Sequence, residues 1–465
     1  MAHLGSNDQP LRVAIIGSGP AGFYSVSNLL KHADVCIEMD MYEKLPTPFG
    51  LVRAGVAPDH QKYKSVTRGY DKSANASSFR FFGNVEFGKH ITLQDLRAYY
   101  HQVIFATGAQ TDRPLDIPGE TATGSHSATD FVAWYNGHPE FTDREFDLSV
   151  RSAAIIGLGN VAVDVARILC KEPEELQSTD ITDYALDALR HSNVDTVYIL
   201  GRRGPAQAAF TTPEIKEMGE LHATDVHVQA DEVELDAVSR AALAESGDKN
   251  AIKNVEVINE FAQWQASGKR KQLTIRFLVS PTEIVADADG RVSGVRLVRN
   301  AAYRAEDGSV RVKPTTAEEV LPVQLVFRSV GYLGVRLPDV PFDAAAAVIP
   351  NREGRVVDEQ GDAHIGMYVA GWIKRGPSGV IGTNKTDAKE TVACMIEDVR
   401  DGNCWQPAHS AVSDLIALLR SRQPDLVTYD DWRSLDQIEV QKGLQADRPR
   451  VKFTDVSEML SVLER

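Results

Sequence analysis

The sequence predicts an α/β protein that contains two Rossmann-like, three-layer dinucleotide-binding domains. The main observation is a repeated pattern: an apolar strand, a glycine-rich turn and an amphipathic helix occur at residues 11–33 and again at residues 153–169. The chain also has 465 residues, of which 43% are hydrophobic. It is therefore too long for one compact core and has the composition of a globular protein. We expect at least two domains, with one of them around each turn.

Composition and charge disfavour several classes of protein. The formal net charge of −15 disfavours general binding to nucleic acid or to anionic membranes. No apolar run has the length that a bilayer requires. The first ten residues, MAHLGSNDQP, show neither the apolar region of a signal peptide nor the Arg- and Ser-rich pattern of a transit peptide, so we expect a cytoplasmic protein.

The four cysteines, Cys36, Cys170, Cys394 and Cys404, are scattered along the chain. They form no C-x-x-C motif and no metal-type pairing with histidine. We therefore expect no metal site, no iron–sulfur cluster and no disulfide-reductase centre, and we interpret these cysteines as small buried apolar residues.

The first glycine-rich turn lies in VAIIGSGPAG, residues 13–22. Gly17 permits the tight turn, Gly19 lets the backbone approach a pyrophosphate, and Gly22 lets the helix pack closely on the strand. The pyrophosphate would then lie at the helix N-terminus, where unpaired N–H groups favour negative charge. We expect Ser18 and Ala21 of the same turn to contact this cofactor.

The strand after this turn identifies the nucleotide. It ends at Glu43, 21 residues after Gly22, where a carboxylate would accept hydrogen bonds from an adenosine ribose. The same charge would repel a 2′-phosphate, so we expect FAD or NAD here, with the adjacent Lys44 at the same site. An ordinary solvated acid is the alternative. A later strand ends at Thr107 and Gly108, where the chain must turn close to a ligand.

The second turn has the same spacing, with Gly157, Gly159 and an alanine at position 162. Alanine at the third position still allows close packing of helix and strand. Asn160 and Val161 would offer the first N–H groups of the helix to a pyrophosphate.

The end of the following strand distinguishes this second site from the first. Where the first site has Glu43, the second has Arg202 and Arg203. Guanidinium groups pair bidentately with phosphate oxygens, which favours NADP(H); a solvated turn is the alternative. We therefore expect one fold to hold a fixed flavin and the other to deliver a diffusible nicotinamide to it.

Four longer stretches carry a family resemblance. They are PTPFGLVRAGVAPDH (46–60), GLGNVAVDVARIL (157–169), GRRGPAQAAFTTPEIKEM (201–218) and YVAGWIKRGPSGVIGTNK (368–385). Over nearly its whole length the chain resembles the NADPH–ferredoxin reductases of the adrenodoxin-reductase type, including their bacterial members. The resemblance implies a glutathione-reductase-like fold in which an NADP domain (110–331) is inserted into an FAD domain (1–109 and 332–465). One departure is His101, where the family usually has aspartate; we expect only a local effect.

The resemblance also assigns roles within the 46–60 stretch. Its prolines and glycines predict a shaped loop, and the resemblance implies that Gly50, Leu51 and Val52 line the flavin. His60 matches a histidine near the nicotinamide, with a surface or capping role as the alternative. Asp59 is expected to cap the helix that follows.

A second shaped loop is expected at residues 371–382. The turn and the helix that begins near Ile381 or Gly382 would stabilise negative charge on the reduced flavin. Trp372 stands where many flavoproteins have aspartate, with core packing as its alternative role. The resemblance implies FAD contacts at Gly371, Trp372, Gly379, Val380 and Ile381, and NADP contacts at Trp372 and Gly379.

The expected reaction needs no protein nucleophile, because the cofactors carry the chemistry. The resemblance implies that NADPH gives a hydride to FAD N5 and that single electrons then pass to an iron–sulfur ferredoxin. Glu214 matches a glutamate at the nicotinamide carboxamide, and His60 and Glu214 are the predicted catalytic residues. For Glu214 the alternative is a glutamate favoured by a helix dipole in the first turn.

The ferredoxin partner is expected to dock on a basic surface, because ferredoxins are usually acidic and this chain is acidic too. The basic candidates are Arg202, Arg203, Lys216, Lys374, Arg375 and Lys385. We expect a monomer, with a weak dimer as the alternative. The alternative functions are a flavin-dependent NADPH monooxygenase, an electron-transfer flavin subunit of a larger complex, and a redox-sensing NADP-binding protein.

Overall fold

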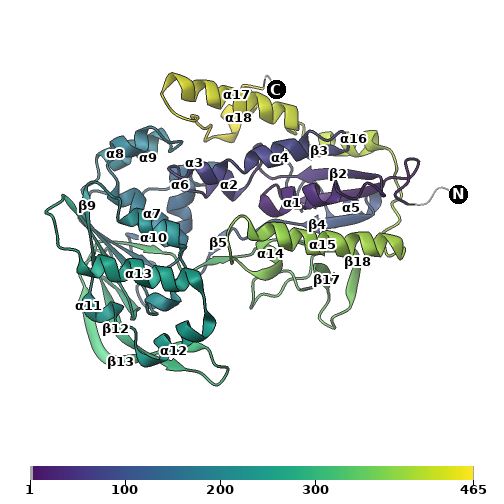
Figure 1. Ribbon diagram of the computed structural model, residues 1–465. Helices are drawn as coiled ribbons and strands as arrows, with labels where there is room; N and C mark the ends of the chain where they lie inside the picture. Colours follow the sequence, from purple (N-terminus) through teal and green to yellow (C-terminus); the bar gives the residue numbers. More distant parts are fainter. Residues whose placement is uncertain (1–3, 464–465) are drawn as a thin grey trace. The chain divides into compact units, whose positions relative to one another are not determined.

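The computed structural model describes residues 4–463, and the chain divides into two compact units. Among the described residues, the first unit contains residues 4–56, 60–111 and 332–463, drawn in purple to blue and in green to yellow in Figure 1. The inserted unit contains residues 57–59 and 112–331. The predicted boundaries did not anticipate that residues 57–59 group with the inserted unit.

The first unit is built on a seven-stranded sheet of order β16-β17-β18-β4-β1-β2-β3. Its strands are β1 (Leu11–Ile16), β2 (Ile37–Tyr42), β3 (Phe79–Phe82), β4 (Gln102–Phe105), β16 (Asn351–Arg352), β17 (Arg355–Val357) and β18 (Ala363–Val369). The pairs from β18 to β3 are parallel, whereas β16, β17 and β18 pair in antiparallel fashion. Because these strands are parallel, the carboxyl ends of β1, β2, β4 and β18 lie at the same edge of the sheet. Ligands bind at this edge in such sheets.

Helices cover both faces of this sheet. One face packs on α1 (Pro20–Leu29), α15 (Thr383–Arg400) and α17 (Tyr429–Gln445), and the other packs on α5 (Leu93–Tyr99) and α16 (Val412–Arg422). The remaining helices of the unit are α2 (Leu51–Ala54), α3 (Gln61–Lys64), α4 (Thr67–Ala74), α14 (Trp372–Arg375) and α18 (Val456–Ser461). These three layers agree with the predicted architecture.

The inserted unit has a six-stranded parallel sheet of order β6-β14-β7-β8-β10-β9. Its strands are β6 (Ser125–Ser127), β7 (Ser152–Ile156), β8 (Thr196–Leu200), β9 (Thr224–Val228), β10 (Lys271–Arg276) and β14 (Leu325–Arg328). The near-continuous apolar runs of β7 and β8 fit strands that are buried on both faces.

One face of this sheet is covered by helices and the other by a second sheet. The helices that pack on the first of these faces are α6 (Ala128–Asn136), α7 (Asn160–Cys170), α8 (Pro173–Gln177), α9 (Asp183–Arg190), α10 (Thr212–Met218) and α13 (Lys249–Gln263). The opposite face packs on an antiparallel sheet of β11 (Val279–Ala286), β12 (Val292–Arg304) and β13 (Val310–Leu321). The other α-helices of the unit are α11 (Ala230–Val233), whose Val233 joins the same core as the helices of the first face, and α12 (Ala237–Ser246). The unit is therefore also three-layered.

Besides the ends of the 57–59 segment, the chain passes from one unit to the other at residues 111–112 and 331–332. Strands β5 (Thr111–Asp112) and β15 (Tyr332–Leu333) form a two-stranded sheet. The Gln110 N–H donates to the Leu333 carbonyl at 3.0 Å, and the Arg113 N–H donates to the Gly331 carbonyl at 2.9 Å.

Two composition-based expectations can be compared with the structure. Within residues 4–463, no helix combines the length and the apolarity that crossing a bilayer requires. Cys170, Cys394 and Cys404 are buried, whereas Cys36 is half-buried. Burial raises the pKa of Cys170 to about 12 and that of Cys404 to about 11, so these two thiols stay protonated at neutral pH.

Candidate functional site

The first glycine turn joins β1 to α1 and is shaped to leave one side open. A Cβ on Gly17, whose φ is 104°, would lie 2.6 Å from the Ala106 carbonyl oxygen, and one on Gly22 would lie 2.2 Å from the Gly17 carbonyl oxygen. A Cβ on Gly19 would meet nothing within 4 Å. The two outer glycines are thus required by the protein itself, and the middle one faces free space at a helix N-terminus. That arrangement fits a pyrophosphate.

Glu43 follows β2 and is held against this turn. Its Oε2 atom accepts hydrogen bonds from the Ser18 N–H at 3.1 Å and the Ser18 hydroxyl at 2.6 Å. Its Oε1 atom accepts one from the Leu45 N–H at 3.3 Å. The carboxylate is therefore fixed beside the phosphate turn instead of standing free in solvent, as the ribose-binding role requires. The strand expected to end at Thr107 and Gly108 ends at Phe105, and Gly108, whose φ is 70°, lies in the segment after it with open space beside it.

The 46–56 loop lies directly on the glycine turn. The Phe49 N–H donates to the Ser18 carbonyl at 3.1 Å. A Cβ on Gly50 would lie 3.1 Å from the Gly19 Cα. Val52 is buried on α2, whereas Leu51 is half-buried. The structure therefore brings the predicted flavin-lining residues to the predicted phosphate site.

The two residues at the end of the 46–60 stretch have different environments. His60 is buried, occupies the N-cap position of α3 without a side-chain cap bond, and meets the Tyr63 ring edge-on at 5.3 Å. The prediction that Asp59 caps this helix is wrong. Its carboxylate instead pairs with Arg167 and Lys171 of the inserted unit, because two cations bind it more strongly than a backbone N–H does.

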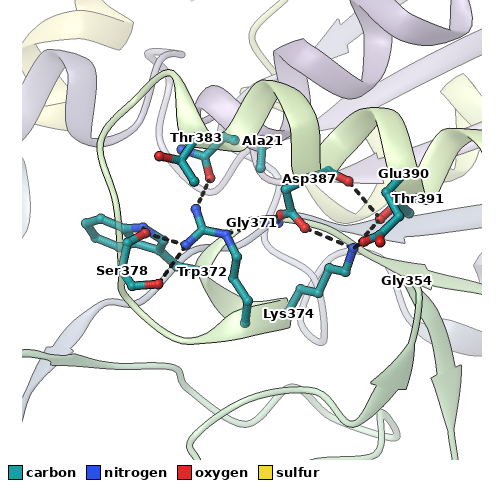
Figure 2. A network of polar contacts seen from close by, with 12 residues as sticks. Ala21, Gly354, Gly371, Trp372, Lys374, Ser378, Thr383, Asp387, Glu390 and Thr391 are labelled. Carbon is teal, nitrogen blue, oxygen red and sulfur yellow. Dashed lines mark hydrogen bonds and ion pairs between the residues drawn. The ribbon is translucent and has the colours of Figure 1, made fainter. Parts of the chain in front are cut away.

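The second predicted loop, residues 371–382, is fixed by Asp387 of α15, as Figure 2 shows. The Gly371 N–H donates a short hydrogen bond to the Asp387 carboxylate, and Lys374 Nζ lies 2.9 Å from it. Gly371 has a φ of 83°, and a Cβ there would lie 2.6 Å from the Ala21 Cβ. The loop is therefore packed on the first turn of α1 in a conformation that only glycine adopts readily.

The tip of this loop is tied together by Trp372 and Arg375. The Trp372 indole N–H donates to the Ser378 carbonyl at 3.1 Å, and Arg375 donates to the same carbonyl. The Trp372 ring is half-buried and lies 5.5 Å from the Tyr332 ring. Gly379 and Val380 are exposed. Helix α15 begins at Thr383, which confirms the helix start expected near residue 382.

One predicted docking residue is excluded by this network. Lys374 is buried, because its Nζ atom contacts the carboxylates of Asp387 and Glu390 and the Thr391 hydroxyl (Figure 2). The earlier assignment of Lys374 to a basic docking surface is therefore wrong. The single turn of α14 points this side chain at α15, which the sequence did not reveal. Lys385 is exposed.

The second glycine turn joins β7 to α7 and repeats the geometry of the first. A Cβ on Gly157, whose φ is 145°, would lie 2.1 Å from the Ser329 carbonyl oxygen, and one on Gly159 would meet nothing within 4 Å. Ala162 is fully buried against the sheet. The Asn160 side chain accepts a hydrogen bond from the Thr211 N–H at 2.8 Å. A bound pyrophosphate fits here as well, because the middle glycine again faces open space.

Arg202 and Arg203 follow β8 beside this turn. Arg202 is exposed and Arg203 is half-buried. Across residues 4–463, neither guanidinium has a hydrogen bond or an ion pair with another group. Burial and the neighbouring Arg202 charge lower the pKa of Arg203. Two adjacent cations without an acidic partner favour a phosphate ligand, so the arrangement fits the 2′-phosphate of NADP(H).

Sequence reasoning missed the charged cluster around Arg167 in the inserted unit. Its guanidinium, 1% exposed, donates to Asp59 at 2.8 and 3.0 Å, to Asp164 at 2.6 Å and to Glu214 at 3.3 Å. Burial opposes ionisation of Asp59, but Arg167 and Lys171 outweigh it and lower its pKa. The i,i+3 spacing of Asp164 and Arg167 on α7 was the only sequence signal for this cluster. Glu214 is therefore buried and held by a cation.

The fold and the two turns define a class of protein. A three-layer unit with an acid at its nucleotide turn, interrupted by a second such unit with two arginines at its turn, is the two-domain arrangement of FAD- and NADP-dependent oxidoreductases with a glutathione-reductase-like fold. In agreement, residues 11–229 match the family model described as pyridine nucleotide-disulphide oxidoreductase.

Individual relatives narrow this class. The chain is 44% identical over 455 residues to the NADPH-ferredoxin reductase FprA of Mycobacterium leprae, and the aligned region covers 97% of this chain and 98% of that protein. It is 42% identical over 472 residues to the mitochondrial NADPH:adrenodoxin oxidoreductase of Bos taurus, which covers 99% and 94%. The structure of Mycobacterium tuberculosis FprA in complex with NADPH matches with a TM-score of 0.92 at 44% identity and covers 98% and 100%. The chain belongs to the NADPH–ferredoxin reductase family of flavoprotein oxidoreductases, as its motifs predicted.

Proposed function

We propose that this chain is an FAD-dependent NADPH–ferredoxin oxidoreductase. The observation that carries the proposal is the contrast between two equivalent strand ends. The acid at the first, Glu43, is bonded to its glycine turn, whereas Arg202 and Arg203 at the second have no acidic partner among the described residues. One site therefore accepts a plain ribose and the other a phosphorylated one, which a flavin and NADPH require.

FAD binds to the domain of residues 1–109 and 332–465. The Gly19 backbone and the N-terminus of α1 hold its pyrophosphate, and Glu43 holds its ribose. The 46–56 loop and the 371–382 loop enclose the ring. The backbone N–H groups of the second loop and the N-terminus of α15 stabilise negative charge on that ring. The residues that contact FAD are Gly17, Ser18, Gly19, Ala21, Gly22, Glu43, Lys44, Gly50, Leu51, Val52, Thr107, Gly108, Gly371, Trp372, Gly379, Val380 and Ile381.

NADPH binds to the inserted domain, residues 110–331. Gly159 and the first N–H groups of α7 hold its pyrophosphate, and Arg202 and Arg203 bind its 2′-phosphate. Glu214 and His60 orient the nicotinamide carboxamide. The residues that contact NADP(H) are Gly157, Gly159, Asn160, Val161, Arg202, Arg203, Glu214, Trp372 and Gly379.

The protein contributes positioning and electrostatics to the reaction. FAD, when bound, supplies a ring that accepts a hydride at N5 and releases the electrons one at a time. Glu214 accepts hydrogen bonds from the carboxamide amide while Arg167 neutralises its buried charge. The same cluster holds Asp59, the residue before His60, in a fixed place. No side chain needs to act as a nucleophile.

The electron acceptor is an acidic iron–sulfur ferredoxin, and the enzyme works in the cytoplasm as a monomer. Exposed Lys216 and Lys385, with any part of Arg202 and Arg203 that NADPH leaves free, supply positive charge for docking. Because the whole chain is acidic, this docking depends on a local basic surface. Raising the salt concentration is therefore expected to slow ferredoxin reduction.

The decisive experiment is anaerobic, NADPH-driven reduction of cytochrome c by the purified yellow protein, with and without added ferredoxin. A large increase that depends on ferredoxin is expected. Rapid bleaching of the flavin by NADPH without any such increase would leave both cofactor sites in place but would refute ferredoxin as the acceptor. A colourless protein that binds NADPH would refute the flavoenzyme assignment itself.

A further inference from the structure

The C-terminal part of the chain contacts the 46–56 loop through an unusually complete set of interactions. We call residues 429–453, which comprise α17 and the segment after it, the C-terminal brace. The contacts converge on Arg53, which lies on α2 next to Val52. Both the loop and the brace belong to the first unit. No sequence motif connects Arg53 with Glu439, which lies 386 positions further along the chain.

The centre of the brace is Glu439, whose side chain is fully buried. Arg53 donates two hydrogen bonds to its two carboxylate oxygens, one of them at 2.8 Å. Arg450 donates at 3.1 Å and the Phe453 N–H at 2.9 Å. Burial opposes ionisation, but Arg53 and Arg450 outweigh it and hold the pKa of Glu439 below its ordinary value. The carboxylate is therefore an ionised, fully bonded anchor.

Three further contacts hold the loop in place near Arg53. The Arg53 guanidinium lies 5.1 Å from the centre of the buried Trp432 ring. Lys452 Nζ donates to the Arg53 carbonyl at 3.3 Å. The edge of the Phe49 ring meets Trp432 at 5.7 Å between ring centres. The brace thus contacts α2 through the side chain and the carbonyl of Arg53. It also contacts Phe49, the aromatic residue that lies before this helix.

The loop needs such support because its backbone is strained. Phe49 has a φ of 86° and Gly50 a φ of 49°. A left-handed backbone is costly for a bulky residue, and it persists only when the surroundings enforce it. This conformation places Phe49 N–H on the Ser18 carbonyl and Gly50 beside Gly19. The strain is therefore located where the loop meets the phosphate turn.

We infer that Glu439 is a positioning residue for the flavin: through Arg53 it fixes Gly50, Leu51 and Val52 against the glycine turn. The inference rests on the proposed role of this loop at FAD. Glu439 acts on the loop through the Arg53 guanidinium. Without the anchor the loop relaxes and FAD leaves the holoenzyme faster.

The test uses the purified holoenzyme and follows FAD release by the rise of flavin fluorescence after dilution. Glu439→Gln removes the charge but keeps the shape of the side chain. We expect release to be at least about tenfold faster, since charge-assisted hydrogen bonds to a buried group are lost. Amide hydrogen exchange at residues 49–54 should accelerate as well. The affinity for NADP+, most of whose proposed contacts lie in the inserted unit, should stay unchanged and shows that this unit is folded.

Matched variants separate this positioning role from a general loss of stability. Glu458→Gln removes a half-exposed carboxylate of α18 that pairs with Lys442 at 3.6 Å, and it should leave FAD release unchanged. Arg53→Lys keeps the charge but not both hydrogen bonds, so its release rate should lie between those of the native enzyme and Glu439→Gln. Should Glu439→Gln fail to fold, Trp432→Phe provides the same comparison at the second contact.

Two results would overturn the inference. One is native FAD release in Glu439→Gln with unchanged exchange at residues 49–54. The other is faster amide hydrogen exchange at residues 49–54 without faster FAD release. That result would mean that the brace stabilises the loop but does not position the cofactor. A native protein that contains no flavin would instead refute the proposed function, so the two failures are distinguishable.

Discussion

The Arg167 guanidinium lies within 3.3 Å of the Glu214 carboxylate and is itself only 1% exposed. The same guanidinium binds Asp59 and Asp164. One buried cation therefore holds the predicted nicotinamide-binding glutamate together with the residue that precedes His60. Such a cation acts on several functional groups at once, and its removal takes this counterion from Asp164 and Glu214 and leaves Asp59 with Lys171.

Arg167→Met is therefore expected to lower the free energy of unfolding of the inserted unit by about 3–5 kcal/mol, the typical cost of leaving a buried charge unpaired. Denaturant unfolding followed by tryptophan fluorescence measures this change. Arg270→Met is the control, because Arg270 pairs with Glu172 at 3.0 Å on the surface and should cost only about 0–1 kcal/mol. Equal effects of the two substitutions would contradict a special role for the buried cluster.

The stability of the same cluster should depend on acid pH. The pKa of Asp59 is lowered in the folded protein, so the folded state binds fewer protons than the unfolded state. Its contribution to stability is then fully present above the unfolded pKa, which is about 4, and is lost as the pH falls toward the folded pKa.

We expect Asp59→Asn to destabilise the protein at pH 7 and to flatten the decline of stability below about pH 4. Thermal unfolding measured between pH 3 and pH 7 provides the comparison. Asp447→Asn changes an exposed carboxyl and should reproduce the native profile. If Asp59→Asn also gives the native profile, the carboxylate is not ionised through its contacts with Arg167 and Lys171.

Arg202→Ala or Arg203→Ala should weaken NADPH binding by about ten- to a hundredfold, because each charge-assisted contact with the 2′-phosphate contributes about 1.5–3 kcal/mol. Binding of NADH, which has no such phosphate, should change little. Titration of each variant with both nucleotides measures the preference. Arg311→Ala, which changes an exposed residue of strand β13, should leave this preference unaltered. If both arginine variants still preferred NADPH over NADH, the assignment of these two arginines to the 2′-phosphate would be wrong.

The sequence predicted those features of the fold that depend on local rules. Gly17 and Gly157 lie at tight turns where a Cβ would meet a backbone carbonyl, and a Cβ on Gly19 would meet nothing within 4 Å. The third position shows how fine these rules are. A Cβ on Gly22 would lie 2.2 Å from a carbonyl oxygen, whereas Ala162 is accommodated in the second turn. Spacing alone did not reveal that only the first turn requires glycine there.

The features that sequence analysis missed depend on partners far apart in the chain. Arg167 meets Asp59 across 108 positions, and Arg53 meets Glu439 across 386. Neither pair has a motif, because each is created by packing between elements. For the same reason Lys374 resembled a surface cation, although the fold turns it onto Asp387.

Asp387 provides the sharpest test of the 371–382 loop. Its carboxylate holds both the Gly371 N–H and Lys374 Nζ from within α15 (Figure 2). Asp387→Asn keeps an acceptor for the Gly371 N–H but removes the charge that faces Lys374, whose other carboxylate partner, Glu390, is half-exposed. We expect the free energy of unfolding to fall by about 1–3 kcal/mol. The visible absorption bands of the bound flavin should shift, because the backbone N–H groups beside the ring move.

The control for this last substitution is Asp34→Asn, which breaks a surface pair with Arg400 at 2.9 Å and should change neither stability nor spectrum. Calorimetry and the flavin spectrum of each holoenzyme give the two readouts. A loss of stability in Asp387→Asn with a native spectrum would mean that the network supports the fold but not the flavin-facing turn. A shifted spectrum in that variant alone would identify Asp387 as the residue through which α15 sets the position of Gly371 and Trp372.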